Sequence, residues 1–400
     1  MFRVIGATVI LPNGVARCEV SVEDGRIAAL DAPATPGEVK VDGRGKVLAP
    51  ALIDIHGDAF ERQMMPRPGV MFPLDPAVLE TDRQLGANGI ATAFHAVTLG
   101  WEPGLRSVEQ GRAFCAALER LGPRLTVENA IQLRWETFAF EAVDLIEEVL
   151  AGPLPAAIAF NDHTSMSMLD PSIRIQDRPF EQAADYPAVS FDAPHLPRKM
   201  AGSAKRAGLD IEPYLERMGD IWTRRAEVPA VIERVAAAGR EAGVGMLSHD
   251  DTQDETRTFY RGLGARISEF PMRIPVAEAA KAAGDAIAFG APNVVRGGSH
   301  IGSPSAAEMV EAGLCDMLAS DYYYPAMLAA VARLHEEKRA PLDKLWRLVS
   351  AGPAEAMHLP ERGEIAVGQR ADLVLLDWPE GETPAVRRTW VKGRLAYSAG

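Results

Sequence analysis

The sequence has little cysteine and no long apolar run. Its 400 residues include three cysteines, Cys18, Cys115 and Cys315, which lie far apart and form no CxxC pair. This spacing argues against a disulfide framework and a thiolate zinc site, so we expect a protein of a reducing compartment, the cytoplasm. No apolar stretch reaches the roughly 20 residues of a membrane-spanning helix, and the first apolar run is too short for a secretory signal.

Positive charge is also scarce. The chain carries 42 Lys and Arg residues against 55 Asp and Glu residues, a formal net charge of −13. An acidic chain gains little from counterion release on nucleic acids and is not attracted to anionic membranes, so we expect neither as a partner. The 47% hydrophobic content is typical of a folded protein with a large core. The oligomeric state stays open, with a homodimer as one possibility.

Strand-like segments separated by turns occupy both ends of the chain. Residues 1–50 and 360–400 alternate apolar and polar residues around glycine turns, of which Asp24-Gly25 is one. We expect the two segments to form one small β-sandwich domain together. The alternative, two independent strand pairs, would be only marginally stable.

The middle of the chain, residues 51–359, alternates strand-like and helix-like stretches. The strand candidates lie in VLAPALIDIH, GIATAFHAV, LTVENAIQLRW, AAIAFND, VGMLSHD, ARISEF, AIAFG and CDMLASD. Eight strand–helix units without a Rossmann glycine pattern predict an α/β fold of the (β/α)₈ TIM-like barrel type, with a doubly wound open sheet as the alternative. An insertion at about residues 165–220 follows the fourth strand and is expected on the active-site face.

Imidazole and carboxylate side chains follow several of the predicted strands. Six of them are candidate metal ligands: His56, Asp58, Glu136, His163, His249 and Asp321. Each one alone could be a structural histidine or a loop-capping acid, but the carboxyl ends of barrel strands meet at one face. Together they predict a site for two divalent transition-metal ions, with zinc first and manganese or iron as alternatives.

The predicted metal pair indicates hydrolysis as the reaction class. Two bridged ions lower the pKa of a bound water, so that hydroxide is available near neutral pH. Asp321, which follows the last strand, is the expected catalytic base that takes a proton from this water and passes it to the leaving group.

Several segments resemble one enzyme family. They are IDIHGDAFER with MPRPGV close behind, QLRWE, DHT, SHDD, APNVVRGGSH and SDYYYP. The general arrangement resembles the amidohydrolase superfamily, and the RPGV and NVVRGGSH segments resemble its PhnM family of phosphonate metabolism. This resemblance implies a diphosphatase that cleaves α-D-ribose 1-methylphosphonate 5-triphosphate to the 5-monophosphate and pyrophosphate, with the six residues above as metal ligands.

The sequence departs from the family pattern at two places beside the expected ligands. Gln132 and Gly57 stand where the family has His and Thr. The bridging lysine of the superfamily has no evident counterpart after the third or fourth strand, and Glu136 is expected in its place. These departures leave a changed substrate open.

A substrate with several phosphate groups requires positive charge around the site, because guanidinium groups clamp phosphate oxygens with paired hydrogen bonds. The candidate substrate-binding residues are Arg67, Arg134, Arg257, Arg296, Ser299, His300 and His95. Ser299 and His300 follow a glycine pair able to form an anion nest. His95 is equally well explained as a packed core histidine. The cations at positions 198–206 of the insertion are expected as a solvated rim more than as a cover over the substrate.

Two other functions fit part of the pattern. A C–N hydrolase of the deacetylase or cyclic-amidase type would use the same metals with fewer arginines. A non-catalytic barrel that serves as a scaffold would have no need for the complete set of ligands.

Overall fold

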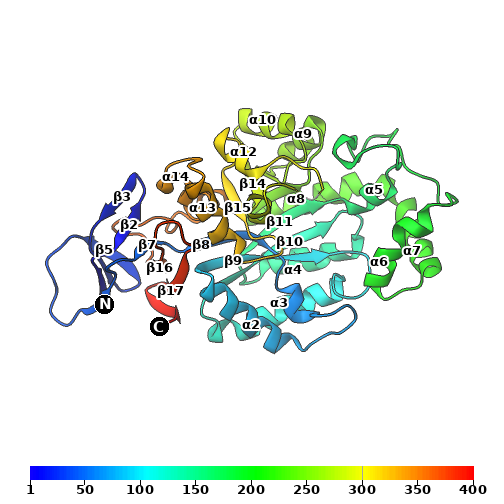
Figure 1. Ribbon diagram of the computed structural model, residues 1–400. Helices are drawn as coiled ribbons and strands as arrows, with labels where there is room; N and C mark the ends of the chain where they lie inside the picture. The colour runs from blue at the N-terminus through cyan, green and yellow to red at the C-terminus, as the bar shows by residue number, and fades with distance from the viewer. Residues whose placement is uncertain (300) are drawn as a thin grey trace.

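The computed structural model describes residues 1–299 and 301–400, whose strands form three sheets (Figure 1). The largest sheet has eight parallel strands in sequence order: β8 (Leu52–Gly57), β9 (Ile90–Leu99), β10 (Glu128–Glu136), β11 (Ala156–Asn161), β12 (Gly245–His249), β13 (Ile267–Glu269), β14 (Ala286–Gly290) and β15 (Met317–Ala319). A parallel bridge between Gly57 and Asp321 joins the last strand to the first. The predicted (β/α)₈ barrel is therefore confirmed.

The barrel closes directly beside the predicted ligands. The backbone N–H of Asp321 donates to the carbonyl of His56, and the N–H of Asp58 donates to the carbonyl of Asp321, both at 2.9 Å. The strands are buried on both faces, as is typical of a parallel sheet covered by helices. Closure thus fixes three of the predicted site residues relative to one another through the backbone alone.

Helices surround the barrel and connect its strands. The α-helices of this layer are α1 (Glu61–Met64), α2 (Leu74–Ala87), α3 (Val108–Leu121), α4 (Val143–Ala151), α8 (Val228–Ala242), α9 (Asp254–Gly262), α10 (Ile274–Ala282), α11 (Ala291–Arg296), α12 (Ala306–Glu311), α13 (Ala326–Glu336), α14 (Leu342–Arg347) and α15 (Ala351–Ala356). Short 3₁₀ turns are η1 (Gly122–Arg124), η2 (Phe140–Ala142), η3 (Ile175–Asp177) and η4 (Arg225–Glu227). Among the described residues, none of the helices is both long and apolar enough to cross a bilayer.

The two chain ends build two further sheets, which Figure 1 shows at one end of the molecule. One has the order β5-β4-β1-β6, with β1 (Phe2–Ile5), β4 (Val20–Glu23), β5 (Arg26–Leu30) and β6 (Val39–Asp42). The other has the order β18-β17-β16-β7-β2-β3, with β2 (Thr8–Leu11), β3 (Gly14–Arg17), β7 (Val47–Pro50), β16 (Leu373–Asp377), β17 (Ala385–Val391) and β18 (Arg394–Ser398). Side chains from both sheets, including Val4, Leu48 and Trp390, share one apolar core.

The first strand predicted for the barrel, VLAPALIDIH, is in fact two strands. Residues 47–50 pair antiparallel with β16 in the terminal sheet, whereas residues 52–57 enter the barrel. Ala51 lies at the junction, where its N–H donates to the carbonyl of Asp372. The continuous apolar run concealed this change of sheet, because residues of both strands are buried and the pattern shows no break.

The insertion after the fourth barrel strand forms three helices, α5 (His163–Met168), α6 (Leu196–Ala207) and α7 (Ile211–Thr223). They lie at the end of the molecule opposite the terminal sheets (Figure 1). Leu196, Met200 and Tyr214 are buried in the same core as the strands β10 and β11. The insertion is therefore packed onto the barrel, next to the carboxyl ends of these two strands.

Candidate active site

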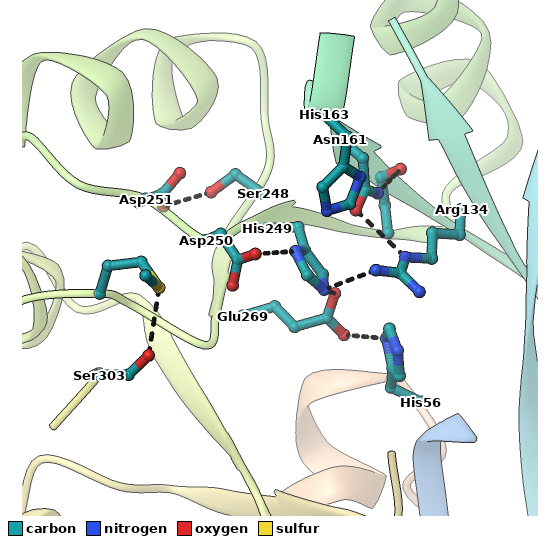
Figure 2. Close-up of polar contacts among 12 residues, drawn as sticks. His56, Arg134, Asn161, His163, Ser248, His249, Asp250, Asp251, Glu269 and Ser303 are labelled. Atoms are coloured by element: carbon teal, nitrogen blue, oxygen red, sulfur yellow. Dashed lines mark hydrogen bonds and ion pairs between the residues drawn. The ribbon is translucent and has the colours of Figure 1, made fainter. Parts of the chain in front are cut away.

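Imidazole and carboxylate groups from five strand ends gather at the carboxyl end of the barrel. Figure 2 shows five of them: His56, His163, His249, Asp250 and Glu269. They form three sets, in each of which the ligand atoms lie within 4.8 Å of one another: His56, His249 and Glu269; His163, His249 and Asp250; His56, Asp58 and Asp321. His56 and His249 each belong to two sets, so that the sets join into one cluster. The structure thus brings together five of the six predicted ligands, all except Glu136.

Glu269 is the carboxylate at the centre of this cluster, and it is not among the ligands predicted from the sequence. Its side chain is fully buried, with Oε1 3.0 Å from His56 Nδ1 and Oε2 3.9 Å from His249 Nε2. Figure 2 shows Glu269 between the two histidines. The signal was present, since Glu269 lies near the end of the predicted strand ARISEF, as His249 lies near the end of VGMLSHD. The two residues end the observed strands β13 and β12.

The cluster fits a divalent cation. Within the described part of the chain, Glu269 Oε2 is buried and has no hydrogen-bond donor. A buried carboxylate oxygen without a donor is unfavourable, and a cation would satisfy it. Imidazole nitrogens together with carboxylate oxygens are ligands that suit zinc, manganese and iron.

Glu136 has a different place from the one expected. Its Oε1 lies 2.6 Å from His163 Nδ1, and its Oε2 accepts a 3.0 Å hydrogen bond from the backbone N–H of His163. Burial opposes the charge of Glu136, but the neighbouring His163 outweighs it and lowers the pKa of Glu136 to about 2. Glu136 therefore orients a candidate ligand but lies outside the three sets, whereas Glu269 belongs to one of them and lies between His56 and His249.

The two departures from the family pattern lie directly beside the cluster. Gln132 Nε2 donates to Glu269 Oε1 at 2.8 Å and so holds the central carboxylate. At Gly57, an added Cβ would lie 2.6 Å from Asp54 Oδ2 and 2.9 Å from Ser320 Oγ. Gly57 thus leaves room for the buried Asp54, which accepts a 2.6 Å hydrogen bond from the Ser320 hydroxyl.

Asp321 has the environment expected of a proton acceptor. Burial, assisted by the negative charge of Asp58 and opposed by His56, raises the pKa of Asp321 to about 6. A base works best when its pKa lies near the working pH. The backbone of Asp321 is left-handed, with φ of 55°, as it is at Asp250 and Phe270, which also follow barrel strands. Left-handed conformations are uncommon in residues other than glycine, and they cluster at functional sites.

Arg134 is a predicted substrate-binding residue that contacts the cluster directly. Its Nε donates to Asn161 Oδ1 at 3.2 Å, and its guanidinium lies 3.4 Å from His249 Nε2 (Figure 2). The guanidinium also lies 3.6 Å from Asp58 Oδ2. It also lines a cavity of about 430 Å³ that adjoins the cluster at His163. Three further cations line this cavity and were not predicted as ligands of the substrate: Arg106, Lys199 and Arg206.

A second, smaller cavity of about 80 Å³ adjoins the cluster at Asp250 and Asp321. Arg296 and Ser299, both predicted to bind substrate, line it. His300, the next predicted residue, lies outside the described residues. Positive side chains therefore border the cluster in both cavities.

Two of the predicted arginines lie elsewhere. Arg257 has no exposed surface, and its Nε lies 3.2 Å from the buried Asp285 while its Nη1 donates to the carbonyl of Ile267 at 3.2 Å. Helix α9 directs Arg257 inward against β13. Arg257 therefore forms a structural ion pair and is not a substrate ligand. Arg67 is exposed on the loop after α1 and lines neither cavity.

His95 is a packed core histidine, which corrects its assignment as a substrate contact. It is buried, with Nε2 2.7 Å from Asn129 Oδ1 and its ring edge-on to Phe60 and Phe114. The contact with Phe114, a residue of α3, shows that the side chain of His95 points outward from the barrel toward the helices. Burial lowers the pKa of His95 to about 4.

This burial predicts an acid-sensitive contribution of His95 to stability. The folded pKa is about 4, below the ordinary value of about 6.5, so the unfolded chain binds a proton first. The free energy of unfolding should therefore fall by about 2 to 3 kcal/mol through this residue as the pH drops from about 6.5 to 4. Urea unfolding of His95→Gln across this range should show a flatter pH dependence than the parent protein. His335→Gln, at an exposed histidine, is the control, and an unchanged slope in His95→Gln would contradict the prediction.

Comparisons with known proteins place this site in a family. A model described as "Amidohydrolase family" matches residues 154–397. The chain is 30% identical over 393 residues to α-D-ribose 1-methylphosphonate 5-triphosphate diphosphatase of Escherichia coli (strain K12), which covers 97% of this chain and 98% of that protein. It is also 30% identical over 74 residues to N-acetylglucosamine-6-phosphate deacetylase of Vibrio furnissii, 18% of each chain. A crystal structure of an amidohydrolase from an environmental sample of the Sargasso Sea superposes with a TM-score of 0.63 at 17% identity, covering 99% of this chain and 93% of that one.

The fold, the cluster and these matches together define a hydrolase of the amidohydrolase superfamily. Within that superfamily the chain belongs to the PhnM family, in agreement with the resemblance of its strand-end segments.

Proposed function

We propose that the protein is a metal-dependent diphosphatase of phosphonate metabolism that cleaves α-D-ribose 1-methylphosphonate 5-triphosphate to the 5-monophosphate and pyrophosphate. The observation that carries the proposal is the position of the metal-binding cluster between two cavities lined by cations. Arg134 borders one cavity and Arg296 the other, so a ligand with anionic groups at both ends meets a guanidinium on each side. The near full-length similarity to the E. coli diphosphatase supports the same substrate.

The metal-binding residues of the proposal are His56, His249 and Glu269 with their neighbours in the cluster. We propose two divalent ions, with zinc first and manganese or iron as alternatives. When bound, such ions lower the pKa of a water and withdraw charge from phosphoryl oxygens.

The chain's own residues have distinct roles in the proposed reaction. A water oxygen forms a bond to the α-phosphorus, and the bond from that phosphorus to the oxygen bridging to the β-phosphorus breaks. The Asp321 carboxylate accepts the proton of the water and afterwards releases it to the departing pyrophosphate. Arg134 offsets the negative charge on the reacting phosphoryl group, which is the main requirement in phosphoryl transfer.

Incubation of the metal-loaded protein with the ribose triphosphate in ¹⁸O-labelled water tests this function. We expect equal amounts of pyrophosphate and 5-monophosphate, with the label in the monophosphate, because attack occurs at the α-phosphorus. Chelation of the metal should stop the reaction. Release of orthophosphate, label in the pyrophosphate, or no turnover would contradict the proposal.

An N-acetylated sugar phosphate, assayed in parallel, tests the C–N hydrolase alternative. The similarity to the deacetylase covers only 18% of the chain, and an amide substrate has no need for cations in both cavities. We therefore expect no release of acetate.

A further inference from the structure

One face of helix α6 borders the larger cavity beside the cluster. Lys199, Ser203 and Arg206 are spaced by four and three residues, which places them on the same side of a helix, and all three line this cavity. We infer that this face, which we call the α6 clamp, binds the terminal phosphates of a polyphosphate chain. The inference deepens the proposed function and rests on it for the rest of the ligand.

The two cations of the α6 clamp are available to a ligand. In the described part of the chain, neither Lys199 nor Arg206 has a carboxylate within ion-pair distance. Lys199 Nζ donates to the carbonyl of Leu169 and Arg206 Nη2 to the hydroxyl of Ser203, both at 2.9 Å. A lysine has three donors and an arginine five, so most of their donors remain free. By contrast, Arg106 in the same cavity is bound by both oxygens of Glu61.

The carboxylates of the cavity already have partners. Glu136 is held by His163, and Glu102 accepts a hydrogen bond from the hydroxyl of Tyr214. Four side chains of the lining are cationic, Arg106, Arg134, Lys199 and Arg206, against the two carboxylates. The lining of the larger cavity therefore holds more positive than negative groups, in a chain with a net charge of −13.

The position of the α6 clamp relative to the cluster suits the outer phosphates of a triphosphate. Arg134 and His163 line the same cavity and belong to or contact the cluster. A substrate with its α-phosphorus at the cluster can thus extend its β- and γ-phosphates toward α6. The helix is held in place by Leu196 and Met200, which are buried in the core, so little ordering is required on binding.

A pair of double variants with the same loss of charge tests the α6 clamp. K199A/R206A removes two positive charges that line the cavity, and R198A/K205A removes two from the same helix outside it. The probe is inorganic tripolyphosphate, titrated calorimetrically into the metal-loaded protein. We expect K199A/R206A to raise the Kd at least about tenfold and R198A/K205A to change it less than about twofold, since charge-assisted contacts are lost only in the first. Equal effects of the two variants, or no effect of K199A/R206A, would overturn the inference.

A third variant and the substrate assay separate the possible outcomes. K199R/R206K keeps both charges and should retain affinity within a few-fold, whereas a loss as large as in K199A/R206A would show that the alanine effect is not one of charge. If tripolyphosphate binding depends on the α6 clamp but the ribose triphosphate yields no pyrophosphate, the clamp is supported and the proposed function fails. If pyrophosphate is released and K199A/R206A binds tripolyphosphate normally, the function is supported and the clamp is wrong.

Discussion

Replacement of Asp321 by asparagine is expected to lower kcat by about 10³-fold or more while the protein keeps its metal. Asparagine has the same shape and an amide oxygen that can remain near the ions, but it cannot accept the proton of the attacking water. It also tolerates the left-handed backbone of this position, where φ is 55°. Steady-state kinetics with the ribose triphosphate, together with elemental analysis of the purified variant, measures both quantities.

Asp24→Asn is the matched control for this experiment. Asp24 also has a positive φ, of 48°, but lies in a turn of the terminal sheets, so its replacement should leave kcat unchanged. Unchanged turnover in Asp321→Asn would exclude its role as the base. Loss of the metal together with turnover would instead show that Asp321 is required chiefly as a ligand.

Replacement of Glu269 by glutamine is expected to have the largest effect on metal affinity. Loss of a residue that only supports a ligand costs roughly 10- to 100-fold in affinity, and we expect a larger loss here because we propose Glu269 as a ligand itself. The neutral amide also leaves His56 and His249 without the carboxylate that lies between them. Competition for zinc against a chelator gives the affinity, and turnover should fall in parallel.

Glu136→Gln tests which glutamate is the bridging carboxylate: Glu269, as the geometry of the cluster indicates, or Glu136, as the sequence predicted. Both acids are buried, end a barrel strand and pair with a histidine, so the two substitutions are closely matched. Because the glutamine oxygen can still accept a hydrogen bond from His163, we expect zinc affinity to fall only about tenfold, the lower end of the range for a supporting residue. If Glu136→Gln loses its metal and Glu269→Gln retains it, Glu136 is the bridging ligand after all.

Much of the barrel was predictable because its signals are local. Each predicted strand is a short apolar run bounded by turns, and each overlaps one of the strands β8 to β15. The error at residues 47–57 arose because an apolar pattern records burial and not the neighbour against which a residue is buried. Only backbone pairing shows that β7 and β8 belong to different sheets.

The candidate metal ligands were likewise predictable only in part. Strand ends in a barrel converge, so the predictions at His56, Asp58, His163, His249 and Asp321 followed from order along the chain. The choice between Glu136 and Glu269 did not, since both residues end a strand. It depends on which histidine each carboxylate faces, a distance of a few ångströms between residues far apart in sequence.

The positions of the cationic side chains were the least predictable from the sequence. Arg257 precedes β13 on a helix whose inner face is buried, and its charge is used inside the protein by Asp285. Lys199 and Arg206, expected mainly as a solvated rim, instead line the larger cavity because α6 packs beside β10 and β11. By itself the sequence determined the barrel, the terminal sheets and the strand ends that carry the candidate ligands, since these follow from local pattern and chain order. The tertiary structure alone decided which charges meet, because long side chains reach in directions that spacing along the chain does not specify.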